Sequence, residues 1–294
     1  MPPATPSLIA VGPWGLCEFD AVRRELDPQN EWPIVATLAE AVPKLAAEGS
    51  PPELILLAQP RPGVDDAGLL EELRRAAPLT RVIVVAGAWC EGELRTGRPL
   101  PGVVRLYWYE FAPWWRAALQ EIACGGAPAW STPLNDPRAG QASAHFSLSV
   151  ERTDGGAIAV DAIDFSVFES LAGALAPWGW TCVWSPRHRP ELIASESKGP
   201  RPVAGIWDGG QLSDNELASL ATFASRLKFA NGAASGAEVR PAPVIALLDF
   251  PRVEHLTDVK RVGGAAILAK PYQVAHLAME LERLAPQRPL SPEP

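Results

Sequence analysis

The hydrophobic residues of this chain fall into two series of short apolar runs, separated by stretches with helical periodicity. Each series has five runs, and several of them are apolar at consecutive positions, as in ELILLA (53–58) and RVIVVA (81–86). Such runs are typical of strands that are buried on both faces of a parallel sheet. The predicted strands are residues 8–12, 33–37, 53–58, 81–86 and 103–109, followed by 157–161, 180–184, 203–207, 244–248 and 265–269.

Helical patterns occupy most of the intervals between these runs. The predicted helices are residues 16–26, 38–48, 65–77 and 113–123, then 166–176, 190–197, 213–228, 253–262 and 274–284. Strands that alternate with helices predict βαβ units with right-handed crossovers. Pro43 must lie in the first turns of its helix or kink it.

The spacing of the strands indicates an internal repeat. The interval from residue 12 to residue 58 nearly equals that from 161 to 208, and the interval 86–109 nearly equals 248–270. The extra length of the second series falls in the Gly/Ala/Pro-rich stretch 229–241, where an insertion costs little. We therefore expect two copies of one (βα)5 unit.

The domain boundaries follow from this repeat. We predict a first domain at residues 1–126, a linker at 127–156 with one edge strand at 145–150, a second domain at 157–285 and a flexible tail at 286–294. The linker and the tail are rich in proline and small polar residues.

Composition excludes several classes of partner. The 294 residues include 26 Lys and Arg against 34 Asp and Glu, a net charge of −8, which disfavours binding to nucleic acid or to anionic lipid. No apolar run approaches the length of a membrane span, and the first residues lack a basic, apolar leader. The four cysteines form no CxxC pair, which fits a reducing compartment. We expect a soluble, cytoplasmic protein.

Candidate chemistry lies at the carboxyl ends of the second series of strands. Asp161 ends the first strand, Asp208 follows the third, and Lys270-Pro271 follows the fifth. Parallel strands end at one edge of their sheet, where open α/β folds bind ligands. Two carboxylates there can bind a hard cation such as Mg²⁺, and a lysine can neutralise the charge of a phosphate.

These three positions resemble the site of receiver domains from two-component response regulators, which are CheY-like and have a flavodoxin-like fold. The resemblance covers residues 157–285. It implies a parallel sheet of order 2-1-3-4-5, Asp208 as the phosphoacceptor, Asp161 and Asp208 as Mg²⁺ ligands, and Lys270 as a phosphate contact. It also implies a protein partner, such as a histidine kinase or another receiver domain.

The second half departs from the receiver pattern at three positions. Ala162 stands where the family has a second acid, Leu248 stands where it has a Thr or Ser, and Ile267 stands at its aromatic position. The hydroxyl that Leu248 replaces normally binds the phosphoryl group. The resemblance therefore implies a partial site.

The first half keeps the strand pattern of the family and lacks its site residues. The segment ELILLAQPRPG (53–63) matches the third strand, but Ala58 stands in place of the aspartate. Gly12 and Pro13 replace the acids, Ala86 replaces the Thr or Ser, and Tyr109-Glu110 replaces Lys-Pro. The family mechanism has no residues to act through here, so the first half is predicted to be a degenerate receiver-like domain.

Three functional hypotheses follow. The first is a non-enzymatic signalling protein with two pseudo-receiver domains that acts through protein–protein contacts. The second is a response regulator that is phosphorylated at Asp208 with Mg²⁺. The third is a flavodoxin-like small-molecule-binding protein or enzyme that uses the segment 87–102, whose four glycines and two prolines predict an irregular loop.

Tryptophan is unusually abundant, with 11 residues against 3 tyrosines. Trp108, Trp114 and Trp115 gather near the last strand and helix of the first half. They form either a partner surface, because tryptophan is enriched at binding hot spots, or part of the core.

Overall fold

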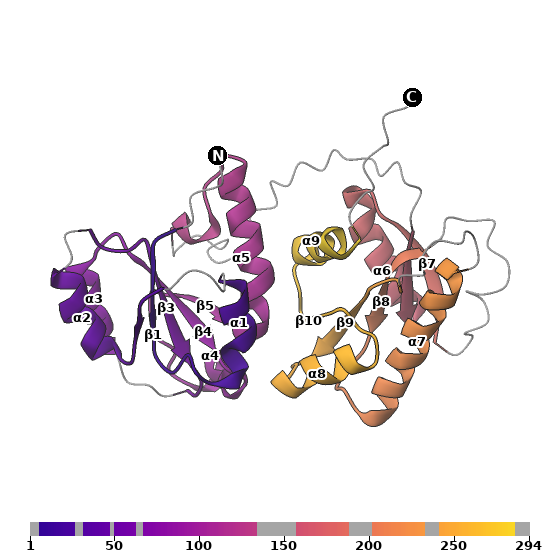
Figure 1. Ribbon diagram of the computed structural model, residues 1–294, viewed down its shortest axis with the longest axis horizontal. Coiled ribbons are helices and arrows are strands. Elements are labelled where there is room, and N and C mark those ends of the chain that lie inside the picture. The colour runs from indigo at the N-terminus through magenta and orange to yellow at the C-terminus, as the bar shows by residue number, and fades with distance from the viewer. Residues whose placement is uncertain are drawn as a thin grey trace. The chain divides into compact units, whose positions relative to one another are not determined.

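The computed structural model describes residues 6–26, 32–47, 50–62, 67–133, 157–187, 202–232 and 241–285, with backbone alone at 228–232 (Figure 1). The chain divides into two compact units, Met1–Ala144 and His145–Pro294. Each unit has its own five-stranded parallel sheet.

The sheet of the first unit has the strand order β2-β1-β3-β4-β5. Its strands are β1 (Leu8–Val11), β2 (Ile34–Val35), β3 (Leu54–Gln59), β4 (Arg81–Ala86) and β5 (Val104–Tyr107). All neighbouring strands are parallel. The strands β3 and β4 are buried along almost their whole length, which explains their unbroken apolar sequences.

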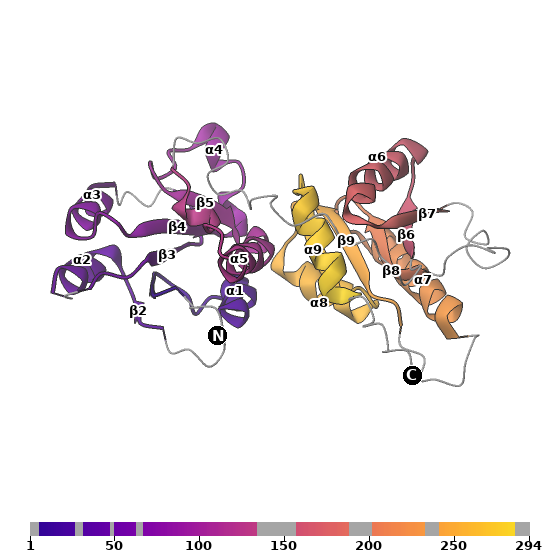
Figure 2. The same ribbon diagram turned by 90° about the horizontal axis from the view of Figure 1, so that it is seen from above.

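Helices cover both faces of this sheet (Figures 1 and 2). On one face lie α2 (Leu38–Ala47), in which Pro43 sits mid-helix, and α3 (Ala67–Ala76). On the other lie α1 (Asp20–Glu25) and α5 (Trp108–Ala123). Leucines from α2 and α3 pack against β1, β3 and β4 in one apolar cluster. The sheet is therefore the middle of three layers.

The second unit repeats this plan. Its sheet reads β7-β6-β8-β9-β10 across its width, built from β6 (Ala157–Ala162), β7 (Thr181–Pro186), β8 (Pro202–Asp208), β9 (Val244–Asp249) and β10 (Ala266–Lys270). Leucines of α6 (Phe165–Leu175) and α9 (Val274–Leu284) pack on one face. Side chains of α7 (Asp214–Gly232) and α8 (Val253–Arg261) pack on the other.

These two sheets confirm the predicted fold class, because each unit is a parallel α/β sheet of order 2-1-3-4-5 with helices on both faces. The helix predicted at 190–197, the edge strand at 145–150, the tail at 286–294 and most of the linker fall outside the described residues. No helix within the described ranges is long and apolar enough to span a membrane.

The boundary between β5 and α5 differs from the prediction. The strand predicted for 103–109 ends at Tyr107, and the helix begins at Trp108 rather than at 113. The carboxylate of Glu110 accepts a hydrogen bond from the Tyr107 backbone N–H at 2.7 Å. This contact caps the helix N-terminus, although the aromatic run had the composition of a strand.

The first unit also extends beyond residue 126. Residues Ala129–Ser131 form a 3₁₀ turn that carries the buried Trp130. The indole N–H of Trp130 donates to Glu53 Oε1 at 2.7 Å, and Arg81 Nε donates to the Trp130 carbonyl at 2.7 Å. The start of the predicted linker is therefore part of the first unit.

Candidate functional site

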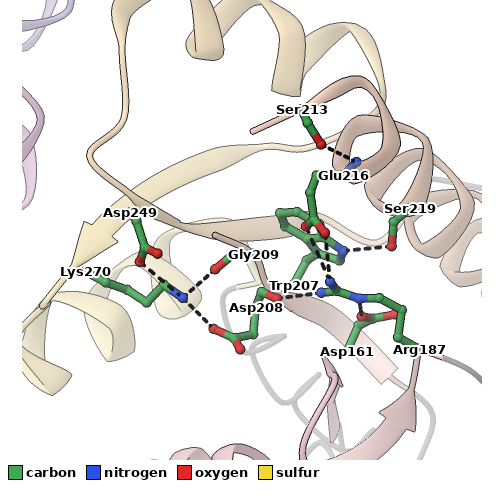
Figure 3. Close-up of polar contacts among 10 residues, drawn as sticks. All are labelled: Asp161, Arg187, Trp207, Asp208, Gly209, Ser213, Glu216, Ser219, Asp249 and Lys270. Carbon is green, nitrogen blue, oxygen red and sulfur yellow. Dashed lines mark hydrogen bonds and ion pairs between the residues drawn. The ribbon is translucent and has the colours of Figure 1, made fainter. Parts of the chain in front are cut away.

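The carboxyl edge of the second sheet gathers four charged side chains from four strands (Figure 3). Asp161 lies near the end of β6, and Asp208, Asp249 and Lys270 end β8, β9 and β10. The parallel pairing places Lys270 opposite Asp249 and Asp208 opposite Leu247. This edge is the place where a parallel sheet brings strand ends together.

Asp208 and Lys270 lie in direct contact, as the sequence resemblance implied. The Lys270 ammonium is 3.1 Å from Asp208 Oδ1 and 3.5 Å from Asp249 Oδ1. It also donates to the Gly209 carbonyl. The side chain of Asp208 is 17% exposed, so its carboxylate is accessible from solvent while Lys270 compensates its charge.

Asp161 has a different partner, Arg187, which follows β7. Arg187 Nε donates to Asp161 Oδ1 at 2.8 Å, and the Asp161 side chain is only 2% exposed. Burial raises the pKa of the Asp161 carboxyl, and the Arg187 guanidinium opposes that rise. A buried carboxylate requires such a counter-charge, because an unpaired one is strongly destabilising.

Arg187 makes three further contacts around this corner. Its guanidinium donates to the Asp208 backbone carbonyl and lies 3.4 Å from Glu216 Oε2 on α7. It also stacks over the Trp207 ring at 4.8 Å from the centroid. Figure 3 shows the guanidinium between Asp161, Glu216 and the end of β8. Arg187 thus ties β6, β8 and α7 together.

The residues present do not fit Mg²⁺ in this arrangement. The carboxylates of Asp161 and Asp208 face two different cations, Arg187 and Lys270, rather than one common point (Figure 3). Across the described part of the chain, no group of three His, Cys, Asp or Glu side chains is placed to hold a metal ion. The Mg²⁺ ligands suggested by the resemblance therefore form two separate ion pairs.

The strand β9 offers no hydroxyl to this corner. Leu248 is completely buried in the cluster that packs under α7 and α8. Ala162 on β6 is likewise buried. Tyr272 is a neighbour that the sequence did not single out, and burial together with the charge of Asp208 raises its pKa to about 12. At neutral pH it carries a neutral hydroxyl near Asp208.

The corresponding edge of the first unit is closed by a different network. Arg105 on β5 pairs with Glu93, and its guanidinium also donates to Gln59 Oε1 at 2.8 Å. Glu93 belongs to α4 (Glu93–Thr96), a single turn inside the segment 87–102 that was predicted to be an irregular loop. Gln59 directly follows Ala58, the residue in place of the aspartate, so neutral and internally paired groups occupy this edge.

Cys90 lies on the same segment and is not a reactive thiol. It is buried, its Sγ donates to the Gln59 carbonyl at 3.3 Å, and burial raises its pKa to about 11. A thiol that stays protonated at neutral pH is a poor nucleophile. Through Cys90 and the Glu93–Arg105 pair, the segment 87–102 is held against the sheet.

The predicted partner surface at Trp108, Trp114 and Trp115 requires correction, because all three side chains are buried. Trp114 and Trp115 pack against Trp130 with ring centroids 5.6 and 5.4 Å apart, and Trp115 stacks on Phe111 at 5.7 Å. These distances are typical of aromatic packing in a core. Trp114 and Trp115 thus hold α5 and the following 3₁₀ turn together.

Comparisons with known proteins find similarity to solved structures alone. No protein-family model matches the chain, and no curated protein matches it. Among solved structures, it is similar to a pilus assembly-related protein of Burkholderia pseudomallei (20% identity over 46% of this chain and 92% of that one, TM-score 0.34). It is also similar to a CheY-like response regulator of Mesorhizobium loti (18% identity over 43% of this chain and 97% of that one, TM-score 0.29). A third similar structure is a histidine-kinase receiver domain of Syntrophus aciditrophicus (19% identity over 47% of this chain and 98% of that one, TM-score 0.32).

Both units have a receiver-like fold. In each, five parallel strands are arranged in the order 2-1-3-4-5 between two layers of helices. In the second receiver-like unit, sequence reasoning found Asp161, Asp208 and Lys270, and it missed Arg187. The available signal was a lone basic residue just past a strand, at the edge where the acids lie.

Proposed function

We propose that this chain is a regulatory protein of a two-component pathway that acts through protein–protein contacts. Its two receiver-like units serve as binding modules, and neither completes a phosphorylation switch. The observation that carries this proposal is Leu248, a fully buried aliphatic side chain at the strand end where the family has a hydroxyl. A leucine cannot donate a hydrogen bond to a phosphoryl group.

The first unit supports the same function. At its edge Ala58 stands in place of the family's aspartate, and the nearby Glu93 carboxylate is buried in an ion pair with Arg105. We propose that this unit contributes binding surface alone. All four cysteines are free thiols, which supports placing the protein in a reducing compartment such as the cytoplasm.

A second candidate function is favoured by the contact between Asp208 and Lys270. A partly exposed aspartate beside a lysine is the arrangement that a phosphoacceptor needs, because the lysine neutralises the incoming charge. In this alternative, a partner histidine kinase or another receiver domain transfers a phosphoryl group to Asp208.

Chemical phosphorylation separates the two functions. The full chain is incubated with acetyl phosphate and Mg²⁺, and phosphoryl incorporation is measured by intact-protein mass spectrometry, with Asp208→Asn as the control. We expect no Asp208-dependent labelling of the wild-type chain. Stable labelling that disappears in Asp208→Asn would overturn the proposal and establish the alternative. Leu248→Thr tests whether the missing hydroxyl is what prevents a switch.

A further inference from the structure

The oxygen atoms around Arg187 are of the kinds that bind hard metal ions. They comprise carboxylate oxygens of Asp161 and Glu216 and the main-chain carbonyl of Asp208. Carboxylates and backbone carbonyls are the ligands that Mg²⁺ and Ca²⁺ select in proteins. In this unit the same set surrounds a guanidinium.

The position of the guanidinium is fixed by more than one contact. Arg187 is 16% exposed, and its Nε, Nη1 and Nη2 atoms each face a different oxygen partner. The Trp207 ring supports it from one side. Arginine suits this role because its fork of donors is planar and its charge is permanent.

Lys270 does not compete for this place. Its ammonium is committed to Asp208 Oδ1, Asp249 Oδ1 and the Gly209 carbonyl. In Figure 3 it approaches Asp208 from the side away from Arg187. Arg187 is thus the cation that contacts Asp161, and the charge of Arg226 adds a further, smaller stabilisation of that carboxylate.

We propose that Arg187 is a tethered cation that takes the place of a divalent metal at the carboxyl edge of the second unit. The guanidinium satisfies Asp161, Glu216 and the Asp208 carbonyl, and its charge repels a second cation. The wild-type edge is therefore closed to Mg²⁺, and removal of the arginine charge opens a latent cation site. This inference deepens the proposed function and rests on it, since both exclude metal-dependent phosphorylation.

The test is a gain of cation binding in the full chain. Arg187→Met keeps an aliphatic stem over Trp207 and removes the charge, whereas Arg187→Lys keeps the charge. Isothermal calorimetry with MgCl₂ measures affinity for each protein. We expect Arg187→Met to bind Mg²⁺ at least about tenfold more tightly than the wild type, and Arg187→Lys to match the wild type. Arg261→Met, which removes an exposed arginine of α8, is the matched control and leaves Mg²⁺ binding unchanged.

Two further variants guard against misfolding and misassignment. Arg187→Gln is a second neutral variant with a polar end, and Asp161→Asn combined with Arg187→Met removes a ligand of the new site and should abolish the gain. Urea unfolding with and without Mg²⁺ gives an independent readout, because a cation that binds only the folded state raises the unfolding midpoint. We expect that rise in the neutral variants alone.

The inference is overturned if neither neutral variant gains Mg²⁺ affinity, if Arg187→Lys gains as much as Arg187→Met, or if the wild type already binds as tightly. These outcomes are distinct from failure of the proposed function. That function fails when the wild-type chain is labelled at Asp208, whereas the inference fails on cation affinity, which is measured without a phosphodonor.

Discussion

The buried imidazole of His276 contributes to the pH dependence of the second unit's stability. His276 lies on α9, is mostly buried, and its Nε2 atom has no hydrogen-bond partner. Burial lowers its pKa from 6.5 to about 4, so the imidazole is neutral in the folded protein. In the unfolded chain the same imidazole takes up a proton near its ordinary pKa.

The expected result is a loss of stability in mild acid. Between about pH 6.5 and pH 4 the unfolded chain binds a proton that the folded chain excludes. The free energy of unfolding therefore decreases as the pH is lowered through this range, and it levels off below about pH 4. Between pH 7 and pH 5 the wild type should lose about 2 kcal/mol more than His276→Phe. Urea unfolding at both pH values measures this difference, in which titrations common to the two proteins cancel. Equal losses would show that His276 is not the group responsible.

The residues of the candidate site that lie at the ends of predicted strands could be predicted from the sequence. Asp161, Asp208 and Lys270 each follow an apolar run, and a parallel sheet collects such ends at one edge. Arg187 was not predictable in the same way, because its role depends on contacts with β6, β8 and α7 together. No local pattern in the sequence reports where a side chain reaches across three elements.

Among the described elements, the segment between β4 and β5 departs from a regular βα repeat. It contains one 3₁₀ turn, Ala88–Cys90, and the single-turn helix α4. The Glu93–Arg105 pair fixes this segment to β5, with the two side chains only 1% and 8% exposed. Exposed hydrophobic residues of the segment, Trp89 and Leu94, point to solvent while the charged pair is buried.

Removing one member of this pair should be costly. Glu93→Gln leaves the Arg105 guanidinium buried without a negative partner, and we expect a loss of about 3 kcal/mol in the free energy of unfolding. Asp20→Asn breaks the exposed pair between Asp20 and Arg23 and should cost less than about 1 kcal/mol. Denaturant titration of the first unit's transition compares them. Similar losses of unfolding free energy in the two variants would show that the Glu93–Arg105 pair does not hold the segment to β5.

The strands with continuous apolar runs were predicted most reliably. A strand that is buried on both faces of a sheet has apolar residues at consecutive positions, which makes it easy to recognise in the sequence. Residues 81–86 were predicted as a strand with the bounds observed for β4. The predicted end of this strand at residue 109 was wrong, because VVRLYWY has strand composition throughout, whereas the observed boundary at Tyr107 depends on the cap by Glu110. The burial of Trp115 depends on Trp130, which lies in a segment expected to be linker.

At the scale of the whole molecule, each unit has its own sheet and its own apolar clusters. The cluster around β1, β3 and β4 belongs to the first unit, and the clusters on the two faces of β6 and β8 belong to the second. The internal repeat was predictable because the two units have nearly the same intervals between strands, although the residues at the strand ends differ. The chemistry of the two edges was less predictable, since Arg105 and Arg187 come from different strand positions.

Independent cores predict additive effects. The double variant Glu93→Gln with His276→Phe should change stability by the sum of the two single changes, within about 0.5 kcal/mol, because the two residues belong to separate compact units and substitutions without shared partners add. The four free energies from one set of urea titrations at pH 7 form a complete cycle. A coupling energy well above that margin would show that the two units stabilise each other.

Gly12, at the end of β1, limits how the first unit could change in evolution. Its φ is +102°, and a Cβ atom there would lie 2.8 Å from the Ala58 carbonyl oxygen. A side chain at position 12 therefore meets both an unfavourable backbone conformation and a steric clash. An acid introduced at position 12 would therefore require the backbone between β1 and β3 to move apart, and a single substitution there is expected to destabilise the first unit.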